Sequence, residues 1–231
     1  MGRLFGTDGV RGVANKDRTC ELAMQLGRAA AKVLTNKSNR HPKVIIGKDP
    51  RISSDMLENA LAAGLCSVGA SVITLGVIPT PAVAYLVGKY KADAGIMISA
   101  SHNSFEYNGV KIFSGDGYKL PDAMEEKIED IILGKENIQE DIAVDERIGT
   151  ITHAAGAVDD YIEHIKSTVH FALDGLEIAI DCANGASSVT AEKLFTDLGA
   201  RVHMLNNKPD GINVNENCGS THMEGLIEYV K

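Results

Sequence analysis

Tryptophan is absent from the 231 residues, and aromatic residues of all kinds make up only 5% of them. Stacking surfaces for single-stranded nucleic acids or sugars need exposed aromatic rings, so this composition argues against such a surface. Basic residues are also in the minority, because 23 Lys and Arg stand against 31 Asp and Glu, for a formal net charge of −8. Without a stripe of Lys and Arg, nucleic-acid binding is not expected.

Cysteine is scarce and scattered along the chain. The four cysteines Cys20, Cys66, Cys182 and Cys218 form no Cys-x-x-Cys pair and no Cys/His set at zinc-site spacing. We therefore expect neither a metal finger nor a redox motif, but reduced thiols in a cytoplasmic protein. No apolar stretch follows Arg3, so a signal peptide is not expected.

A long run without charge, residues 59–88, does not predict a membrane span. Glycines and prolines divide it into a helix, a strand and a turn, each shorter than the roughly 20 residues that cross a bilayer. We interpret it as core, and we expect no membrane partner.

The acidic residues are unevenly distributed. Residues 121–147 hold ten acidic and three basic side chains, so the rest of the chain is nearly neutral. We interpret this segment as a solvated helix face and a linker, with Met124, Ile128, Ile131 and Ile132 turned inward. An anion could therefore approach the remainder of the chain without strong repulsion.

The apolar periodicity predicts an α/β fold in two related halves. In the first half we expect a helix over residues 19–35, a strand over 43–47, a helix capped by Ser53 or Ser54, and a strand over 71–75. The same order of elements recurs in the second half, where we expect a strand over 176–181, a helix with Val189 and Leu194 inward, and a strand after Gly199. We predict one domain over residues 1–155 and a second over 156–231, in which Thr221 and Glu224 have capping-box spacing before a final helix.

Residues 94–103 carry the most informative pattern, since an apolar strand leads directly into Ser101, His102 and Asn103. Lys111 follows ten residues after Ser101, at the end of an Asn108-Gly109 pair that favours a turn. Ser101 can carry a phosphate, His102 and Lys111 can neutralise it or move protons, and Asn103 can orient a neighbour. The flanks differ from the Gly-x-Ser-x-Gly elbow of hydrolases, and these residue types also occur in ordinary loops.

Four segments together resemble the α-D-phosphohexomutase superfamily. They are residues 99–103 with 108–111, the glycine-rich opening over residues 5–12, residues 181–186, and residues 217–222. Many relatives have a proline after the Ser-His-Asn triplet, where this chain has Ser104. Proline would restrict the backbone, so Ser104 leaves the loop freer without removing a reactive group.

The resemblance implies an isomerase with two three-layer α/β/α domains with mixed sheets, the second truncated before its metal-binding loop. It implies that Ser101 stores a phosphate, gives it to one end of a hexosamine 6-phosphate, and retrieves the other phosphate from the bisphosphate. Ser101, His102, Lys111 and Arg11 are then the catalytic residues. Ser101 would also bind Mg²⁺ through its phosphate, with the other metal ligands and the remaining domains expected beyond Lys231, so this piece alone would be inactive.

Several alternatives stay open at this point. The same mechanism could serve glucose or mannose phosphates, although the opening segment favours the hexosamine branch. A short non-catalytic module could use the Ser101 segment to bind an anion or a partner. His102 could be a loop histidine that satisfies a backbone carbonyl. We interpret residues 48–51 as a helix N-terminal turn with Asp49 as the cap, and leave them out of the site.

Overall fold

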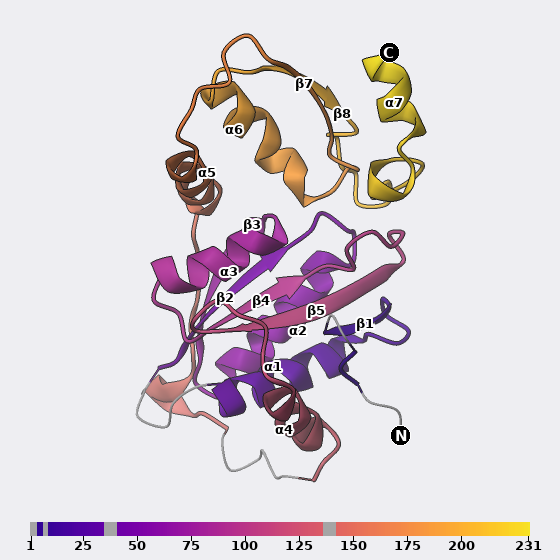
Figure 1. The fold of residues 1–231 in the computed structure, drawn as a ribbon. Coiled ribbons are helices and arrows are strands. Elements are labelled where there is room, and N and C mark those ends of the chain that lie inside the picture. The colour runs from indigo at the N-terminus through magenta and orange to yellow at the C-terminus, as the bar shows by residue number, and fades with distance from the viewer. Residues whose placement is uncertain (1–3, 7–8, 35–40, 136–141) are drawn as a thin grey trace.

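The computed structural model (Figure 1) describes residues 4–6, 9–34, 41–135 and 142–231. Positions 7 and 8 of the glycine-rich opening and position 35, the expected end of the first helix, lie outside these ranges. The strands are β1 Val10–Val13, β2 Lys43–Lys48, β3 Ser71–Val77, β4 Ala94–Ile98, β5 Tyr107–Ser114, β6 Ile151–His153, β7 Glu177–Asp181 and β8 Arg201–Leu205. The α-helices are α1 Cys20–Leu34, α2 Ser54–Cys66, α3 Thr80–Lys89, α4 Asp122–Ile132, α5 Ala157–Thr168, α6 Ala191–Asp197 and α7 Glu224–Val230. Short 3-10 helices cover Asp145–Arg147, Ala186–Val189 and Gly219–Thr221.

The strands form two sheets. Six strands, in the order β1-β5-β4-β2-β3-β6, make a mixed sheet, and β7 and β8 make a parallel pair. In the mixed sheet β5 runs antiparallel to both of its neighbours, β1 and β4, while β2, β3, β4 and β6 are parallel. The expected α/β class with a mixed sheet is therefore confirmed. Because β4 and β5 follow each other in sequence, residues 99–106 form the tip of a hairpin, which we call the Ser101 loop.

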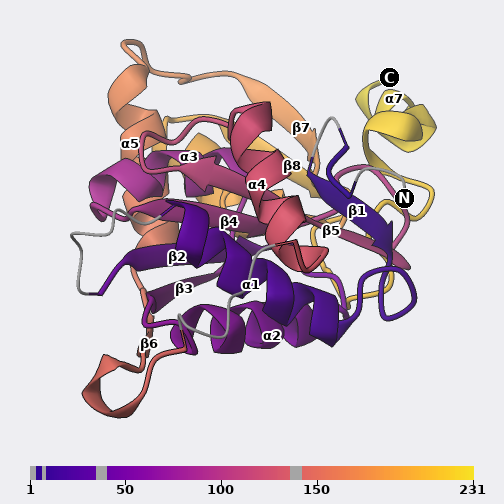
Figure 2. The same ribbon diagram turned by 90° about the horizontal axis from the view of Figure 1, so that it is seen from below.

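Helices cover both faces of the six-stranded sheet (Figures 1 and 2). Helices α1, α2 and α4 enclose one apolar core with β2 and β4, and α3 and α5 enclose a second core on the opposite face. Every residue of β4 is buried, as expected for a strand covered on both faces. We call this sheet and helices α1 to α4 the first unit. The second unit comprises β7, β8, α6, α7 and the segments between them, and Figure 1 shows it on the α3 side of the sheet.

Glycine allows α1 and α2 to pack closely, and Figure 2 shows the two helices next to each other. A Cβ added at Gly64 would lie 2.2 Å from the Met24 carbonyl oxygen, and one at Gly27 would lie 2.5 Å from that of Leu61. Both distances are too short for a side chain, so the spacing of the helices depends on these two positions.

Most of the expected helices and strands are present, with local corrections. Val189 was expected to face inward from a helix, but it lies in a 3-10 helix, is 39% exposed, and precedes α6. The predicted capping box is wrong, because Thr221 ends the last 3-10 helix and Met223 is the N-cap of α7. Gly156 is the N-cap of α5, and the division into domains at residues 155 and 156 stays a prediction.

Residues 59–88 form parts of α2, β3 and α3, and many of their apolar side chains lie in the two cores, as expected. The turn expected after the strand is wrong, because Pro79 is the N-cap of α3 and Pro81 lies in the first turn of this helix. Within the described ranges, no helix combines the length and the apolar character that crossing a membrane would require.

Candidate active site

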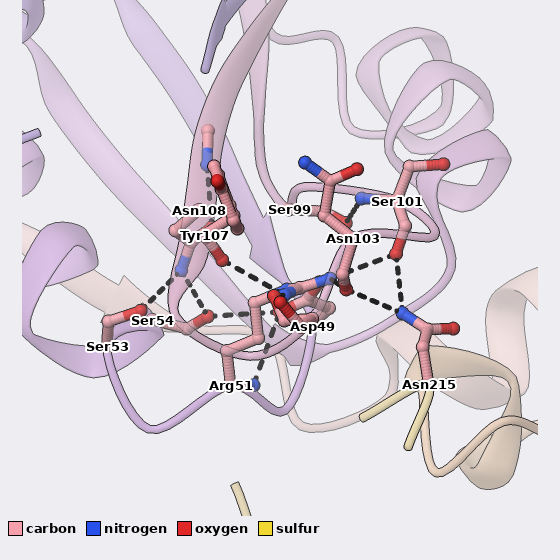
Figure 3. A network of polar contacts seen from close by, with 12 residues as sticks. Asp49, Arg51, Ser53, Ser54, Ser99, Ser101, Asn103, Tyr107, Asn108 and Asn215 are labelled. Atoms are coloured by element: carbon pink, nitrogen blue, oxygen red, sulfur yellow. Dashed lines mark hydrogen bonds and ion pairs between the residues drawn. The ribbon is translucent and has the colours of Figure 1, made fainter. Parts of the chain in front are cut away.

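Ser101 lies just beyond the buried end of β4, where the chain reverses direction. Ser99 and Ala100 are buried, whereas Ser101 is exposed and has a φ of +58°, which is uncommon for a residue with a side chain. Its backbone N–H donates to the Ser99 hydroxyl oxygen at 3.0 Å. Figure 3 shows its hydroxyl pointing away from the side chains that hold its carbonyl group. The geometry therefore fixes the backbone of Ser101 and leaves the hydroxyl open to a reactant.

Arg51 binds the backbone of the Ser101 loop, although the sequence interpretation left residues 48–51 out of the site. Arg51 is only 2% exposed, and its guanidinium donates to backbone carbonyls of the loop and of the start of β5 (Figure 3). The acceptors are the carbonyl oxygens of Ser101 (2.9 Å), Asn103 (2.9 Å), Tyr107 (3.0 Å) and Ser104. Arginine suits this position because its planar group presents several donors in a fixed geometry.

Asp49 neutralises Arg51 and is not the cap of α2, so that part of our interpretation is wrong. One carboxylate oxygen of Asp49 accepts from Arg51 Nε at 2.9 Å, and the other accepts from the Arg51 backbone N–H and the Ser54 hydroxyl, both at 3.2 Å. The N-cap of α2 is Ser53, whose side chain makes no capping hydrogen bond. Both charged partners are buried, and a buried charge requires such pairing.

Asn108 lies inside β5 and not in a turn, which corrects the expectation for the Asn108-Gly109 pair. Its side chain is fully buried, and its amide nitrogen donates to the hydroxyl oxygens of Ser53 (2.9 Å) and Ser54 (3.1 Å). Its side-chain oxygen accepts from the Gly109 backbone N–H at 2.8 Å. Asn108 therefore joins the start of α2 to the strand that follows the Ser101 loop.

The sheet brings Arg11 and Lys111 to neighbouring strands. Arg11 of β1 pairs with Gly109, and Lys111 of β5 pairs with Met97 of β4. Residues opposite each other in an antiparallel pair, and residues two apart on one strand, share a face of the sheet. Arg11 and Lys111 therefore lie on the same face, and Lys111 borders a 210 Å³ pocket with Gly9, Thr80, Phe113 and Lys119.

Gly109 permits this arrangement because it carries no side chain. A Cβ at this position would lie 2.9 Å from the Val10 carbonyl oxygen and 3.1 Å from that of Ser99. The Ser99 N–H donates to the Gly109 carbonyl oxygen at 2.9 Å, which continues the ladder between β4 and β5 up to the Ser101 loop.

His102 is exposed next to Ser101 in the turn. In the described part of the chain, no hydrogen bond joins the Ser101 hydroxyl to the side chain of His102 or Lys111. The structure thus places the predicted residues on one hairpin and on the strand beside it.

Asp181 connects residues 181–186 to residues 217–222, the two other segments that resemble the superfamily. Its carboxylate accepts from the backbone N–H groups of Ala183 (2.8 Å) and Gly219 (2.9 Å) and from the Asn206 amide (3.0 Å). From the same unit, Asn215 Nδ2 donates to the carbonyl oxygens of Ser101 (3.0 Å) and Asn103 (2.9 Å). The sequence interpretation missed Asn215, although it lies just before the fourth segment of the resemblance.

A metal ion in a protein is held by several ligands at once. Among the described residues, no group of three or more His, Cys, Asp or Glu side chains is arranged to hold one. The exposed hydroxyl of Ser101 could contribute phosphate oxygens once phosphorylated, and these are hard ligands of the kind that Mg²⁺ prefers.

Comparison with known proteins gives the family. Residues 2–139 match the family described as phosphoglucomutase/phosphomannomutase, alpha/beta/alpha domain I. The chain belongs to the phosphoglucomutase/phosphomannomutase family. The Ser101 loop, Arg51, Lys111 and Arg11 all lie within the part that matches this domain of the family.

Curated relatives and solved structures in this family match over nearly the whole chain. The phosphoglucosamine mutases of Acetivibrio thermocellus and Ruminiclostridium cellulolyticum are 57% and 56% identical to it over its entire length. The chain spans 51% of each of these relatives, about half of their length. A phosphoglucomutase/phosphomannomutase family protein from Burkholderia thailandensis has a TM-score of 0.81 at 24% identity, covering 99% of this chain and 50% of that one. The Paramecium phosphoglucomutase parafusin has a TM-score of 0.68 at 17% identity, covering 92% and 44%.

Proposed function

We propose that this chain is the phosphoserine-bearing half of a phosphoglucosamine mutase, which interconverts glucosamine 6-phosphate and glucosamine 1-phosphate. The observation that supports the proposal is the identity of 56–57% to phosphoglucosamine mutases along the entire chain. The structures of family members are too distant in sequence to support a particular sugar, so they support the fold alone.

The proposed reaction moves a phosphoryl group from Ser101 to the sugar and back. The bond between phosphorus and Ser101 Oγ breaks as phosphorus bonds to a sugar hydroxyl oxygen, which gives its proton to a base. The Ser101 oxygen then attacks the other phosphate of the bisphosphate, and the released sugar oxygen takes up a proton. The exposed hydroxyl at the tip of the hairpin suits this cycle, because each sugar phosphate must reach it.

The neighbouring side chains supply charge and protons in this proposal. Arg11 binds phosphate oxygens from β1, since a guanidinium can donate two parallel hydrogen bonds to them. Lys111 of β5 and His102 of the loop carry the protons and offset the phosphate charge. Mg²⁺, held through the phosphate on Ser101 and by ligands expected beyond Lys231, would neutralise part of that charge when bound.

The central test is Ser101→Ala in the protein at the full length of its relatives. We expect the parent protein to interconvert the glucosamine phosphates and to carry one phosphate on Ser101 by mass spectrometry. Ser101→Ala should lose both the phosphate and at least about a thousandfold of the turnover, because the covalent carrier is gone. The control is Ser167→Ala, which removes a hydroxyl from the exposed side of α5 and should keep both.

Full turnover by Ser101→Ala would contradict the proposal. Turnover of mannose or glucose phosphates in preference to glucosamine phosphates would assign the chain to a phosphomannomutase or phosphoglucomutase instead. An unphosphorylated Ser101 together with no turnover of any hexose phosphate would favour a non-catalytic module that binds an anion or a partner. The 231-residue chain by itself should be inactive, and measurable turnover by it would show that the missing half is dispensable.

A further inference from the structure

Two side chains from different units donate hydrogen bonds to the same two backbone carbonyl groups. The carbonyl oxygens of Ser101 and Asn103 each accept from Arg51 Nη2 at 2.9 Å. The same two oxygens accept from Asn215 Nδ2, at 3.0 and 2.9 Å. Figure 3 shows Arg51 and Asn215 converging on this pair of carbonyls from separate segments, with the Ser101 hydroxyl on the other side of the loop.

The two donors differ in how firmly each is held. Arg51 is 2% exposed and paired with Asp49 inside the first unit. Asn215 is half-buried and belongs to the second unit, where its backbone N–H donates to the Ala183 carbonyl oxygen at 2.9 Å. A movement of the second unit would therefore carry Asn215 with it and leave Arg51 in place.

A second contact reinforces this connection between the units. The Ile52 backbone N–H, one residue after Arg51, donates to the Gly211 carbonyl oxygen at 2.9 Å. Gly211 has a φ of +96°, and a Cβ there would lie 3.3 Å from the Ile52 nitrogen. Residues 211–215 therefore rest against both the segment that carries Arg51 and the Ser101 loop.

The backbone of Ser101 depends on these contacts. Its left-handed φ of +58° is an unfavourable conformation for serine that its surroundings must maintain. Its N–H is held by Ser99, and its carbonyl is held by Arg51 and Asn215. The direction of the hydroxyl follows from this backbone conformation.

We propose that Arg51 and Asn215 are positioning residues for the Ser101 hydroxyl, and that Asn215 makes its orientation depend on the placement of the second unit. The inference rests on the proposed function of Ser101 as the phosphate carrier. Phosphoryl transfer needs the attacking and leaving oxygens nearly in line, so a small rotation of the loop slows the reaction more than it weakens binding.

The test is Asn215→Asp in the full-length protein, compared with Asn217→Asp. Aspartate keeps the size of asparagine and tolerates a positive φ, but it replaces the donating amide by a carboxylate that repels the two carbonyl oxygens. Asn217 also has a positive φ, is exposed, and is not bonded to the Ser101 loop, so its variant adds the same charge without the proposed effect.

We expect Asn215→Asp to lower kcat about tenfold or more, with KM changed less than about twofold. Hydrogen exchange at the amides of Ser101 and Asn103 should also become faster, because the loop has lost one of its two anchors. Asn217→Asp should match the parent protein in both measurements. Arg51→Lys should have a larger effect in the same direction, but Asn215 carries the test because a variant of buried Arg51 could fail to fold.

The outcomes separate this inference from the proposed function. If Asn215→Asp equals Asn217→Asp in kcat, the positioning role is overturned, whatever the exchange shows. A different result would contradict the proposed function alone. In that case the parent protein turns over no sugar phosphate, while hydrogen exchange at the Ser101 and Asn103 amides still becomes faster only in Asn215→Asp, which supports the contact from the second unit to the loop.

Discussion

At the scale of single residues, the candidate site depends on side chains that bind backbone atoms. Arg51 and Asn215 hold the carbonyl groups of the Ser101 loop, and Asn108 holds the Gly109 N–H and the hydroxyls at the start of α2. These hydrogen bonds join the three side chains to backbone groups and to serine hydroxyls of the protein. They fix the backbone from which the reactive groups project.

Asn108→Ala tests this role for a fully buried side chain. We expect it to lower the free energy of unfolding by about 2–4 kcal/mol, because the buried Gly109 N–H and the buried Ser54 hydroxyl lose a partner where water cannot replace it. Urea denaturation would measure the change. Asn59→Ala is the matched control, since Asn59 is exposed on α2 and alanine favours helices, so its effect should stay within about 0.5 kcal/mol. Equal effects of the two substitutions would contradict the role of Asn108.

The sequence gives a signal for the proposed reactive residues, whose roles stay predictions, and none for the residues that hold the Ser101 loop. Ser101, His102 and Lys111 stand out because polar groups with chemical capacity directly follow a buried strand. Arg51 and Asn215 contact carbonyl groups that are 50 and 114 residues away from them in the chain. Every residue has a backbone carbonyl group, so no sequence pattern can identify which carbonyl groups Arg51 and Asn215 bind. The turn expected at Asn108-Gly109 failed because pairing with β1 and β4 outweighs the local preference.

At the scale of elements, the spacing of α1 and α2 is the feature most open to test. Gly64→Ala would place a methyl group 2.2 Å from the Met24 carbonyl oxygen, so the helices must separate. We expect a loss of about 1–3 kcal/mol in the free energy of unfolding, from overpacking. Gly88→Ala in α3 is the control, because its methyl group meets no atom within 4 Å, and it should be neutral or stabilising by up to about 1 kcal/mol. Thermal denaturation of both variants would show whether their shifts have opposite directions.

Sequence patterns predicted the elements themselves with more success than their ends. The buried strands and the helix stripes recur at the expected periods, so β2, β3, β4, α1 and α2 lie close to their predicted ranges. The helix expected around Val189 begins only at Ala191, because residues 186–189 form a 3-10 helix first. Such endings depend on contacts across the chain, which the local pattern does not contain.

At the scale of the whole molecule, α5 attaches to the first unit through a polar contact with α3. The Tyr90 hydroxyl donates to Asp160 at 2.7 Å, and the Lys89 ammonium lies 2.9 Å from the same carboxylate. The ring of His164 stacks on Tyr85 with 3.6 Å between the ring centroids. The hydrogen bonds from Lys89 and Tyr90 lower the pKa of Asp160 below its ordinary value of 3.8.

This contact predicts a pH dependence of stability with a definite sign. Because the pKa of Asp160 is lower in the folded state, its contribution is complete above the ordinary value and is lost as the pH falls through the lowered one. Asp160→Asn should therefore lower Tm by a constant amount between about pH 5 and 7, and the difference from the parent should shrink below about pH 3.5. Calorimetry over this range would measure it. A difference that is independent of pH down to pH 2 would contradict the assignment to the ionised carboxylate.

The antiparallel direction of β5 has a consequence for how this family can vary. Lys111 is held opposite Met97 by the ladder between β5 and β4, whereas Ser101 is the third of the eight residues that connect these two strands. An exchange of the side chain at Ser104 therefore leaves Lys111 in register with β4, and the loop backbone that carries the proposed nucleophile Ser101 keeps its contacts with Arg51, because these contacts use carbonyl groups that every residue has.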